Sequence, residues 1–240
     1  MSGTTSLNYA TYQDALATLM ATTSADPDFV TILPRCIEYA EQRIYRELDI
    51  LNTRFRDTSS TCAPGSRSVT LPDTLMVCET LAVLTPAGQQ PPTAQRNILV
   101  PCTHDFIDMV YPSDAAASQA MPQYFAMIGQ AQALVGPCPD QAYAVEVFGT
   151  YRPAPLSATN TTTPLTVLLP DLFMAASMIY MAGYQKNFGA QADDPRMAQS
   201  WEQQYQFLMA GAKSEEFRKK FESSSWTSMI PSTEANTQRG

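Results

Sequence analysis

The chain has 240 residues, of which 45% are hydrophobic and only 16% are charged, and its formal net charge is −8. This apolar content is enough for a sizeable core, but charged residues normally make up about a quarter of a globular chain, so much of the polar surface is expected to meet other protein. The negative balance repels a phosphate backbone, which excludes tight wrapping of DNA but is compatible with DNA that passes close by.

Neither the cysteines nor the apolar segments indicate a secreted or membrane-spanning protein. The five cysteines are widely spaced and form no CxxC pair, so we expect reduced thiols. The first six residues contain no basic or apolar run, which predicts no signal peptide. Residues 165–184 are apolar but include Thr166, Pro170 and Gly183, which favours a buried helix over a membrane span.

Two helices are predicted near the start of the chain, over residues 11–48. The first is expected to begin at Thr11, because Thr11 to Asp14 resembles a capping box. The second carries an apolar stripe from Phe29 to Leu48 with charged residues mostly off it. Its regular part is expected to begin near Ile32, since Pro34 is tolerated only in a first turn. We expect the two helices to pack as a hairpin, each covering the stripe of the other.

The middle of the chain, about residues 50–163, has the pattern of short strands separated by Pro and Gly. Gly129-Gln130 suits a tight hairpin turn, and a short helix is expected over residues 103–110. The predicted strands, which alternate or are rich in β-branched and aromatic residues, cover residues 68–71, 75–84, 123–128, 131–135 and 142–151.

Helices are predicted again after Pro164, over residues 171–188 and 195–221. Asp194-Pro195 is a good start signal for the last helix, and residues 223–240 read as an extended tail. The apolar stripe of the last helix consists of Met197, Trp201, Tyr205, Leu208 and Ala212.

The predicted fold class is therefore α+β. We expect a helical bundle, made of the N-terminal hairpin and two long C-terminal helices, with a β-rich insertion and an extended C-terminal tail. Residues 1–222 are predicted to form a single domain, and residues 223–240 the tail.

Residues for catalysis or metal binding are scarce in the sequence. His104 is the single histidine, and its neighbour Asp105 cannot orient the imidazole usefully. The sequence contains no GxSxG, no phosphate-binding loop and no GxGxxG. One histidine without paired cysteines makes zinc binding unfavourable. We therefore predict no enzyme activity, no cofactor and no metal.

Two carboxylate pairs leave a hydrolase open as an alternative. Glu38 with Glu41, and Glu215 with Glu216, are candidates for glycosidase-like acid and base chemistry. Basic residues such as Lys219 lie nearby, as is ordinary on a solvated helix surface, and this interpretation is favoured.

The C-terminal tail combines large apolar side chains with a preceding basic cluster. Burial in a partner would gain each apolar side chain about 1.5–3 kcal/mol. The basic residues favour the dipole at a helix C-terminus and can also meet acidic groups of a partner. The predicted partner-binding residues are Arg218, Lys219, Lys220, Trp226, Met229 and Ile230.

Several short motifs occur along residues 9–215 in an order typical of one protein family. The opening hairpin carries Tyr12-Gln-Asp-Ala-Leu16 and Ala40-Glu41-Gln-Arg43-Ile44-Tyr-Arg46-Glu-Leu48. The later motifs are Leu71-Pro72, Met121-Pro122-Gln-Tyr124-Phe125, Pro155-Leu156-Ser157, Leu169-Pro170-Asp171-Leu172-Phe173 and Trp201. In these motifs the chain resembles the head-to-tail adaptor (connector) proteins of tailed bacteriophages, and it departs from them at Phe125 and Gly183.

The resemblance implies a structural virion protein at the head–tail junction, assembled in the host cytoplasm. Such adaptors form a homo-oligomeric ring beneath the portal protein, here expected to be a dodecamer, and receive tail nozzle or tail-tube proteins below. The ring extends the channel for DNA ejection without binding DNA specifically, and no membrane is involved. A C-terminal extension reaches the portal, which makes the six partner-binding residues above candidate portal-binding residues.

Two other functions remain open from the sequence. One is a virion-associated peptidoglycan hydrolase that uses a carboxylate pair such as Glu38 and Glu41. The other is a monomeric binding module that forms no ring.

Overall fold

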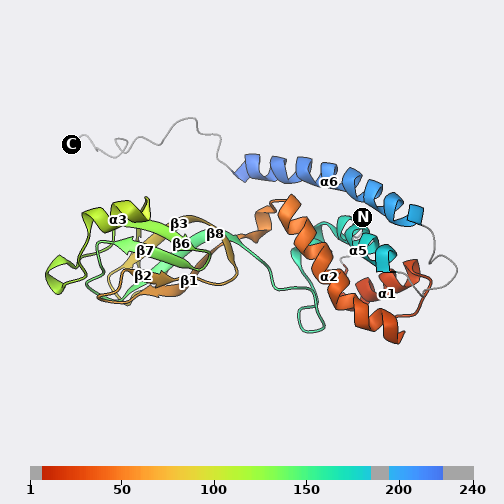
Figure 1. Cartoon of the computed structure of the whole chain (residues 1–240), viewed down its shortest axis with the longest axis horizontal. Helices are drawn as coiled ribbons and strands as arrows, with labels where there is room; N and C mark the ends of the chain where they lie inside the picture. The colour runs from red at the N-terminus through yellow and green to blue at the C-terminus, as the bar shows by residue number, and fades with distance from the viewer. Residues whose placement is uncertain (1–6, 185–194, 224–240) are drawn as a thin grey trace, which may run out of the picture. The chain divides into compact units, whose positions relative to one another are not determined.

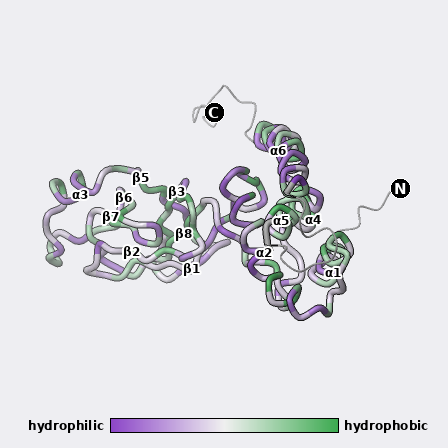
Figure 2. The backbone as a smooth tube through the Cα atoms, turned by 45° about the vertical axis from the view of Figure 1, so that its right-hand side comes forward, coloured by the Kyte–Doolittle hydropathy of each residue, from purple (hydrophilic) through white to green (hydrophobic). Residues whose placement is uncertain are grey.

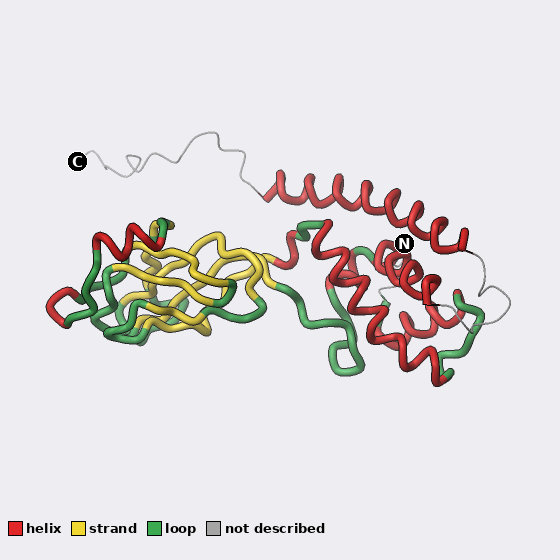
Figure 3. Tube along the Cα trace, in the orientation of Figure 1, coloured by secondary structure: helices red, strands yellow, loops and turns green. Residues whose placement is uncertain are grey.

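The computed structural model describes residues 7–184 and 195–223, which form six α-helices, two short 3-10 helices and eight strands (Figure 1). The chain divides into two compact units, one made of Met1–Leu51 and Pro155–Gly240 and the other of Asn52–Ala154. Helices form the first unit and strands dominate the second (Figure 3). The single domain expected over residues 1–222 stays a prediction.

The helical unit contains five of the helices. They are α1 (Tyr9–Leu19), α2 (Pro27–Glu47), α4 (Pro164–Leu168), α5 (Pro170–Tyr184) and α6 (Pro195–Ser223).

Two helix starts differ from the sequence prediction. Helix α1 is capped by Asn8, and Thr11 closes the capping box from inside the helix instead of starting it. Helix α2 begins directly after Asp26, whose carboxylate accepts hydrogen bonds from the backbone N–H groups of Asp28 and Phe29. Pro34 therefore lies inside α2. Burial of the long apolar stripe on both sides of Pro34 outweighs the one backbone hydrogen bond that proline removes.

Helix α5 is the centre of the helical unit. It packs against α1, α2 and α6. The ring of Tyr12 in α1 stacks on Phe173 in α5 at 4.6 Å between centroids, and the Tyr12 hydroxyl is hydrogen-bonded to Ser177. From α2, the Cys36 thiol donates to the backbone oxygen of Ser177 at 3.2 Å. Helices α1 and α2 thus both pack on α5, and the buried residues of all three helices form one cluster. That the two helices also cover each other's stripes stays a prediction.

The second unit contains two four-stranded sheets in which most neighbouring strands are antiparallel. Their orders are β1-β8-β3-β4 and β2-β7-β6-β5, and β5 and β6 form the one parallel pair among the described strands. The strands are β1 (Arg54–Cys62), β2 (Ser68–Thr70), β3 (Leu75–Thr85), β4 (Gln95–Ile98), β5 (Val100–Pro101), β6 (Tyr124–Gly129), β7 (Gln132–Gly136) and β8 (Tyr143–Tyr151). Helix α3 (His104–Val110) and the 3-10 helices η1 (Leu51–Thr53) and η2 (Ala116–Ser118) complete the elements.

The inner faces of the two sheets share one hydrophobic core. Figure 2 shows hydrophobic residues along β3 and β8, the two central strands of the first sheet. Val83 and Val145 from this sheet and Phe125 and Val135 from the other belong to the same buried cluster. Such face-to-face packing, with alternate residues pointing inward, is that of a β-sandwich.

The prediction of a helical bundle that carries a β-rich insertion is wrong. The protein is α+β, but its strands form two four-stranded sheets with a hydrophobic cluster of their own, and the helical unit has another. Two sheets that each present an inward apolar row can bury those rows against each other and need no helix for it. Among the described helices, none is both long and apolar enough to cross a membrane.

Candidate interaction surface on helix α6

One face of α6 closes the core of the helical unit. Tyr205, Met209 and Ala212 are buried there, at the spacing that puts residues on one side of a helix. Trp201 and Leu208 are partly buried against the same cluster. The apolar stripe predicted for the last helix lies on this face.

An ion pair links this face of α6 to α2. The Nη1 and Nη2 atoms of Arg43 donate to the two carboxylate oxygens of Glu202 at 2.8 and 2.6 Å. The guanidinium carbon of Arg43 also lies 4.2 Å from the centre of the Tyr205 ring. These hydrogen bonds, which Arg43 donates and Glu202 accepts, lower the pKa of Glu202 and raise the pKa of Arg43. A bidentate guanidinium–carboxylate pair fixes the relative orientation of the two side chains as well as their distance, so it orients α6 on α2.

The C-terminal half of α6 holds the segment that leaves α2. The buried carboxylate of Glu216 accepts hydrogen bonds from the backbone N–H of Leu51 and from Lys219 Nζ, both at 2.8 Å. Lys220 forms an ion pair with Asp49. Glu216 therefore acts as a structural link within the helical unit.

The structure separates the six predicted portal-binding residues into three groups. Lys219 pairs with Glu215 at 2.6 Å and with Glu216, and these carboxylates raise the pKa of Lys219. Lys220 pairs with Asp49. Arg218 is exposed and donates to the Ser214 hydroxyl at 3.3 Å. Trp226, Met229 and Ile230 lie outside the described residues.

The outward side of α6 carries large apolar side chains that the sequence prediction missed. Phe207, Phe217 and Phe221 are 80%, 71% and 53% exposed. At 100° per residue they lie within about 80° of one another around the helix axis, and Ala210 and Ser214 fall between them. A signal for them was present, since all three phenylalanines fall off the stripe predicted to be buried.

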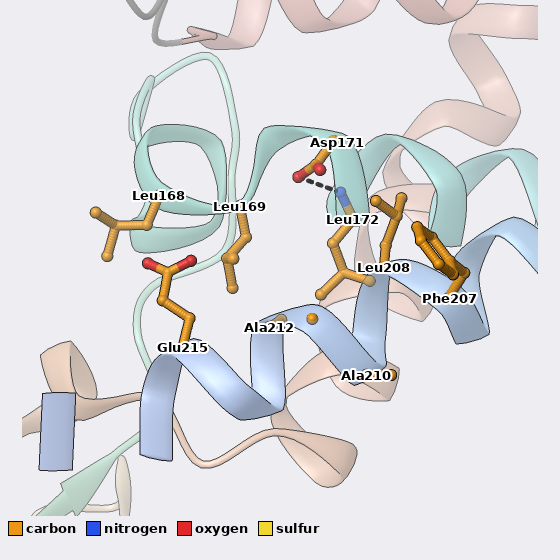
Figure 4. A pocket seen from close by; sticks show the side chains of 10 residues that line it. Leu168, Leu169, Asp171, Leu172, Phe207, Leu208, Ala210, Ala212 and Glu215 are labelled. Atoms are coloured by element: carbon orange, nitrogen blue, oxygen red, sulfur yellow. Dashed lines mark hydrogen bonds between the residues drawn. The ribbon is translucent and has the colours of Figure 1, made fainter. Parts of the chain in front are cut away.

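A mostly apolar groove of about 380 Å³ lies between α6 and the α4–α5 segment (Figure 4). Leu168 and Leu172 line it from one side, and Phe207, Leu208 and Gly211 line it from α6. Two carboxylates add polarity to its lining, those of Asp171 and Glu215. Asp171 Oδ1 accepts a hydrogen bond of 2.8 Å from the backbone N–H of Leu172 at the start of α5.

The helical unit thus has one closed face on α6 and one open apolar surface. The sequence pattern of the SU10 adaptor protein family matches residues 7–227, which cover both units and all of α6. The chain belongs to this family. The match confirms the resemblance to phage head-to-tail adaptors, and an adaptor is a structural component of the virion. No curated protein was found to match the chain.

The carboxylates of this SU10 adaptor have structural or solvent-facing positions. Glu38 is exposed and accepts from Gln42 Nε2, while Glu41 is buried and accepts from the backbone N–H of Leu156 at 2.9 Å. His104 is exposed beside Asp105. In the described part of the adaptor, no three His, Cys, Asp or Glu residues come together as a metal site would require. The arrangement supports packing and partner contact better than acid–base chemistry.

Proposed function

We propose that this adaptor forms a ring that joins the portal of a phage head to the tail and extends the DNA channel. The observation that carries the proposal is the open apolar surface of α6 in a member of an adaptor family. Contiguous exposed apolar surface on a soluble protein marks a contact with other protein. The ring is a dodecamer at the head–tail junction, and it receives nozzle or tail-tube proteins on its tail side.

Portal attachment is assigned chiefly to the segment after α6. Trp226, Met229 and Ile230 are large apolar groups among serines and threonines, and burial in a partner offsets the entropy lost on ordering them. Lys219 and Lys220 already pair with carboxylates of their own subunit. They therefore contribute less to the portal contact than their charge alone suggests, because each would have to exchange one carboxylate for another.

The overall charge supports a channel that lets DNA move. A formal net charge of −8 gives little attraction for a polyanion. DNA then passes along the ring and is not held by it, as ejection requires.

The mass of the assembled species, with and without the portal ring, tests this function. We expect the adaptor to add to purified portal rings as a closed ring of identical subunits, with twelve copies expected per portal. Mass photometry or native mass spectrometry measures the added mass directly. An adaptor that binds portal only as single, independent copies would contradict the ring.

A further inference from the structure

The C-terminal part of α6 bears a protruding apolar feature, which we call the knob. It consists of Phe217 and Phe221, which are four residues apart and therefore lie on one side of the helix. Both side chains are largely exposed in the subunit. Arg218 stands next to them, is exposed, and donates a hydrogen bond to the Ser214 hydroxyl one turn earlier in the helix.

The groove between α6 and the α4–α5 segment is a recess of matching chemistry. Its lining is leucine-rich, and its volume of about 380 Å³ equals roughly a dozen waters at about 30 Å³ each, more than one phenyl ring requires. A Cβ atom built on Gly211, which lines the groove, would meet no other atom within 4 Å, so this wall is open. Asp171 at the start of α5 is exposed, lines the groove and has no oppositely charged partner among the described side chains.

The knob and the groove occupy different places on the same helix. From 100° and 1.5 Å per residue, they lie about 120° apart around the axis of α6 and roughly two turns apart along it. A continuous helix cannot bend its own Phe217 into its own groove, so this knob can reach such a groove only on another copy of the chain. A second copy of this chain supplies both complements at once, an aromatic pair for the leucines and a guanidinium for the exposed carboxylate of Asp171.

We propose that the knob of one copy docks into the groove of the next, with Arg218 placed to pair with Asp171. The inference rests on the proposed ring and names its contact between neighbours. Because knob and groove are different surfaces, the contact is heterologous, and every added copy leaves one knob and one groove free. Such contacts repeat until rotation closes them into a ring. This use of Arg218 leaves portal attachment to the segment after α6.

Two variants, each damaging one half of the contact, test the pairing in the full chain. The double variant Phe217→Asp/Phe221→Asp removes the knob without touching the core, since both side chains are exposed. The variant Gly211→Leu fills the groove, and it is compatible with folding because the position is helical and open. The matched control is Met109→Asp, which changes an equally exposed apolar residue in the other unit. Sedimentation velocity over a concentration series measures self-association.

The expected results separate this contact from other modes of association. Each variant alone should self-associate at least tenfold more weakly than the natural chain, while Met109→Asp should behave like the natural chain. An equimolar mixture of the two variants should form a one-to-one dimer that grows no further, because one partner offers only a groove and the other only a knob. Unchanged assembly of either variant overturns the pairing.

Failure of this pairing can be told from failure of the ring itself. If the natural chain stays monomeric up to the highest concentration, the knob–groove contact between copies is overturned. The mass added to the portal then still decides whether a ring forms by other surfaces. If the variants add to the portal as closed rings of full mass, the ring stands and the pairing falls.

Discussion

The ion pair between Arg43 and Glu202 should be the strongest single link between α2 and α6. Arg43 is mostly buried, makes two charge-assisted hydrogen bonds to Glu202, a third to Glu47, and lies over the Tyr205 ring. Hydrogen bonds to charged groups contribute about 1.5–3 kcal/mol each when buried. The Glu202 side chain is 38% exposed, so solvent screening lowers its share. We expect Arg43→Ala to cost the helical unit about 2–3 kcal/mol.

The assay must report on the helical unit alone, because a chain with two compact units need not unfold in one step. Trp201 is partly buried against the core of this unit, and the other tryptophan, Trp226, can be replaced by Phe. Denaturant unfolding followed by Trp201 fluorescence in a Trp226→Phe background then gives the free energy of unfolding of the unit.

The neighbouring residue Arg46 provides the matched control. It is exposed and its side chain bonds to Gln42 on the same helix, so Arg46→Ala should cost less than about 0.5 kcal/mol. A double-mutant cycle of Arg43→Ala with Glu202→Gln should give a coupling energy of about 1–2 kcal/mol. If Arg43→Ala costs no more than Arg46→Ala, the pair does not hold α6 and the reasoning is refuted.

Four further outcomes follow from the structure. Gly149→Ala should destabilise the sandwich by about 2 kcal/mol or more in chemical unfolding, because the new Cβ would meet a backbone oxygen of β3. A Cβ at Gly129 has open space around it, so an equal loss of stability in Gly129→Ala would contradict the steric explanation. The hydrogen bond from Arg96 lowers the pKa of Glu146, so the stability that this carboxylate contributes is fully present above its unfolded pKa of about 4.3 and is lost as the pH falls from there through the lowered folded pKa. Chemical unfolding at several pH values should show a smaller loss of stability over this range in Glu146→Gln than in the natural chain. Deletion of residues 224–240 should leave the thermal midpoint nearly unchanged but weaken portal binding in a pull-down, and equal binding would refute the role of that segment. Purified protein should bind duplex DNA weakly by gel shift, and tight binding that falls steeply with salt would count against the channel.

Helices α2 and α6 were predictable because each carries an apolar stripe of helical period that is buried. The stripe of α2 and the buried positions of α6 were read from spacing alone. The predicted starts of α1 and α2 were less accurate, because the prediction took no account of Asn8 and Asp26 as N-cap residues. Backbone donors at a helix start need an acceptor, and these two side chains provide it.

The two-sheet arrangement could not be read from the sequence. Strand β1 was missed because its residues, Arg54 to Cys62, are mostly polar and partly exposed. Its place is set by pairing with β8, far along the chain, and by the ion pair of Arg56 with Glu146. A strand with so few apolar residues carries no clear alternation of apolar and polar positions, which is the signal that predicts strands.

The candidate site was predicted in part. The basic cluster before the tail was visible as a run, but Lys220 is matched by Asp49, which only the folded chain brings near. The pairing of Lys219 with Glu215 and Glu216 could have been predicted from the sequence, because these glutamates lie four and three residues before Lys219 on one helix. The groove depends on where α4 and α5 meet α6, which no local pattern specifies.

The two faces of helix α6 have different roles. Its inner face must bury Tyr205 and Met209 to complete the core, while its outer face leaves Phe207 and Phe217 in solvent. A subunit selected only to fold would place polar residues on the outer face, since burial on one side of a helix is enough to hold it. Substitutions on the two faces should therefore separate: truncation at Met209 lowers subunit stability, whereas a polar residue at Phe217 leaves stability unchanged and lowers assembly. That separation identifies the outer face as a surface made for other protein, independently of which partner covers it.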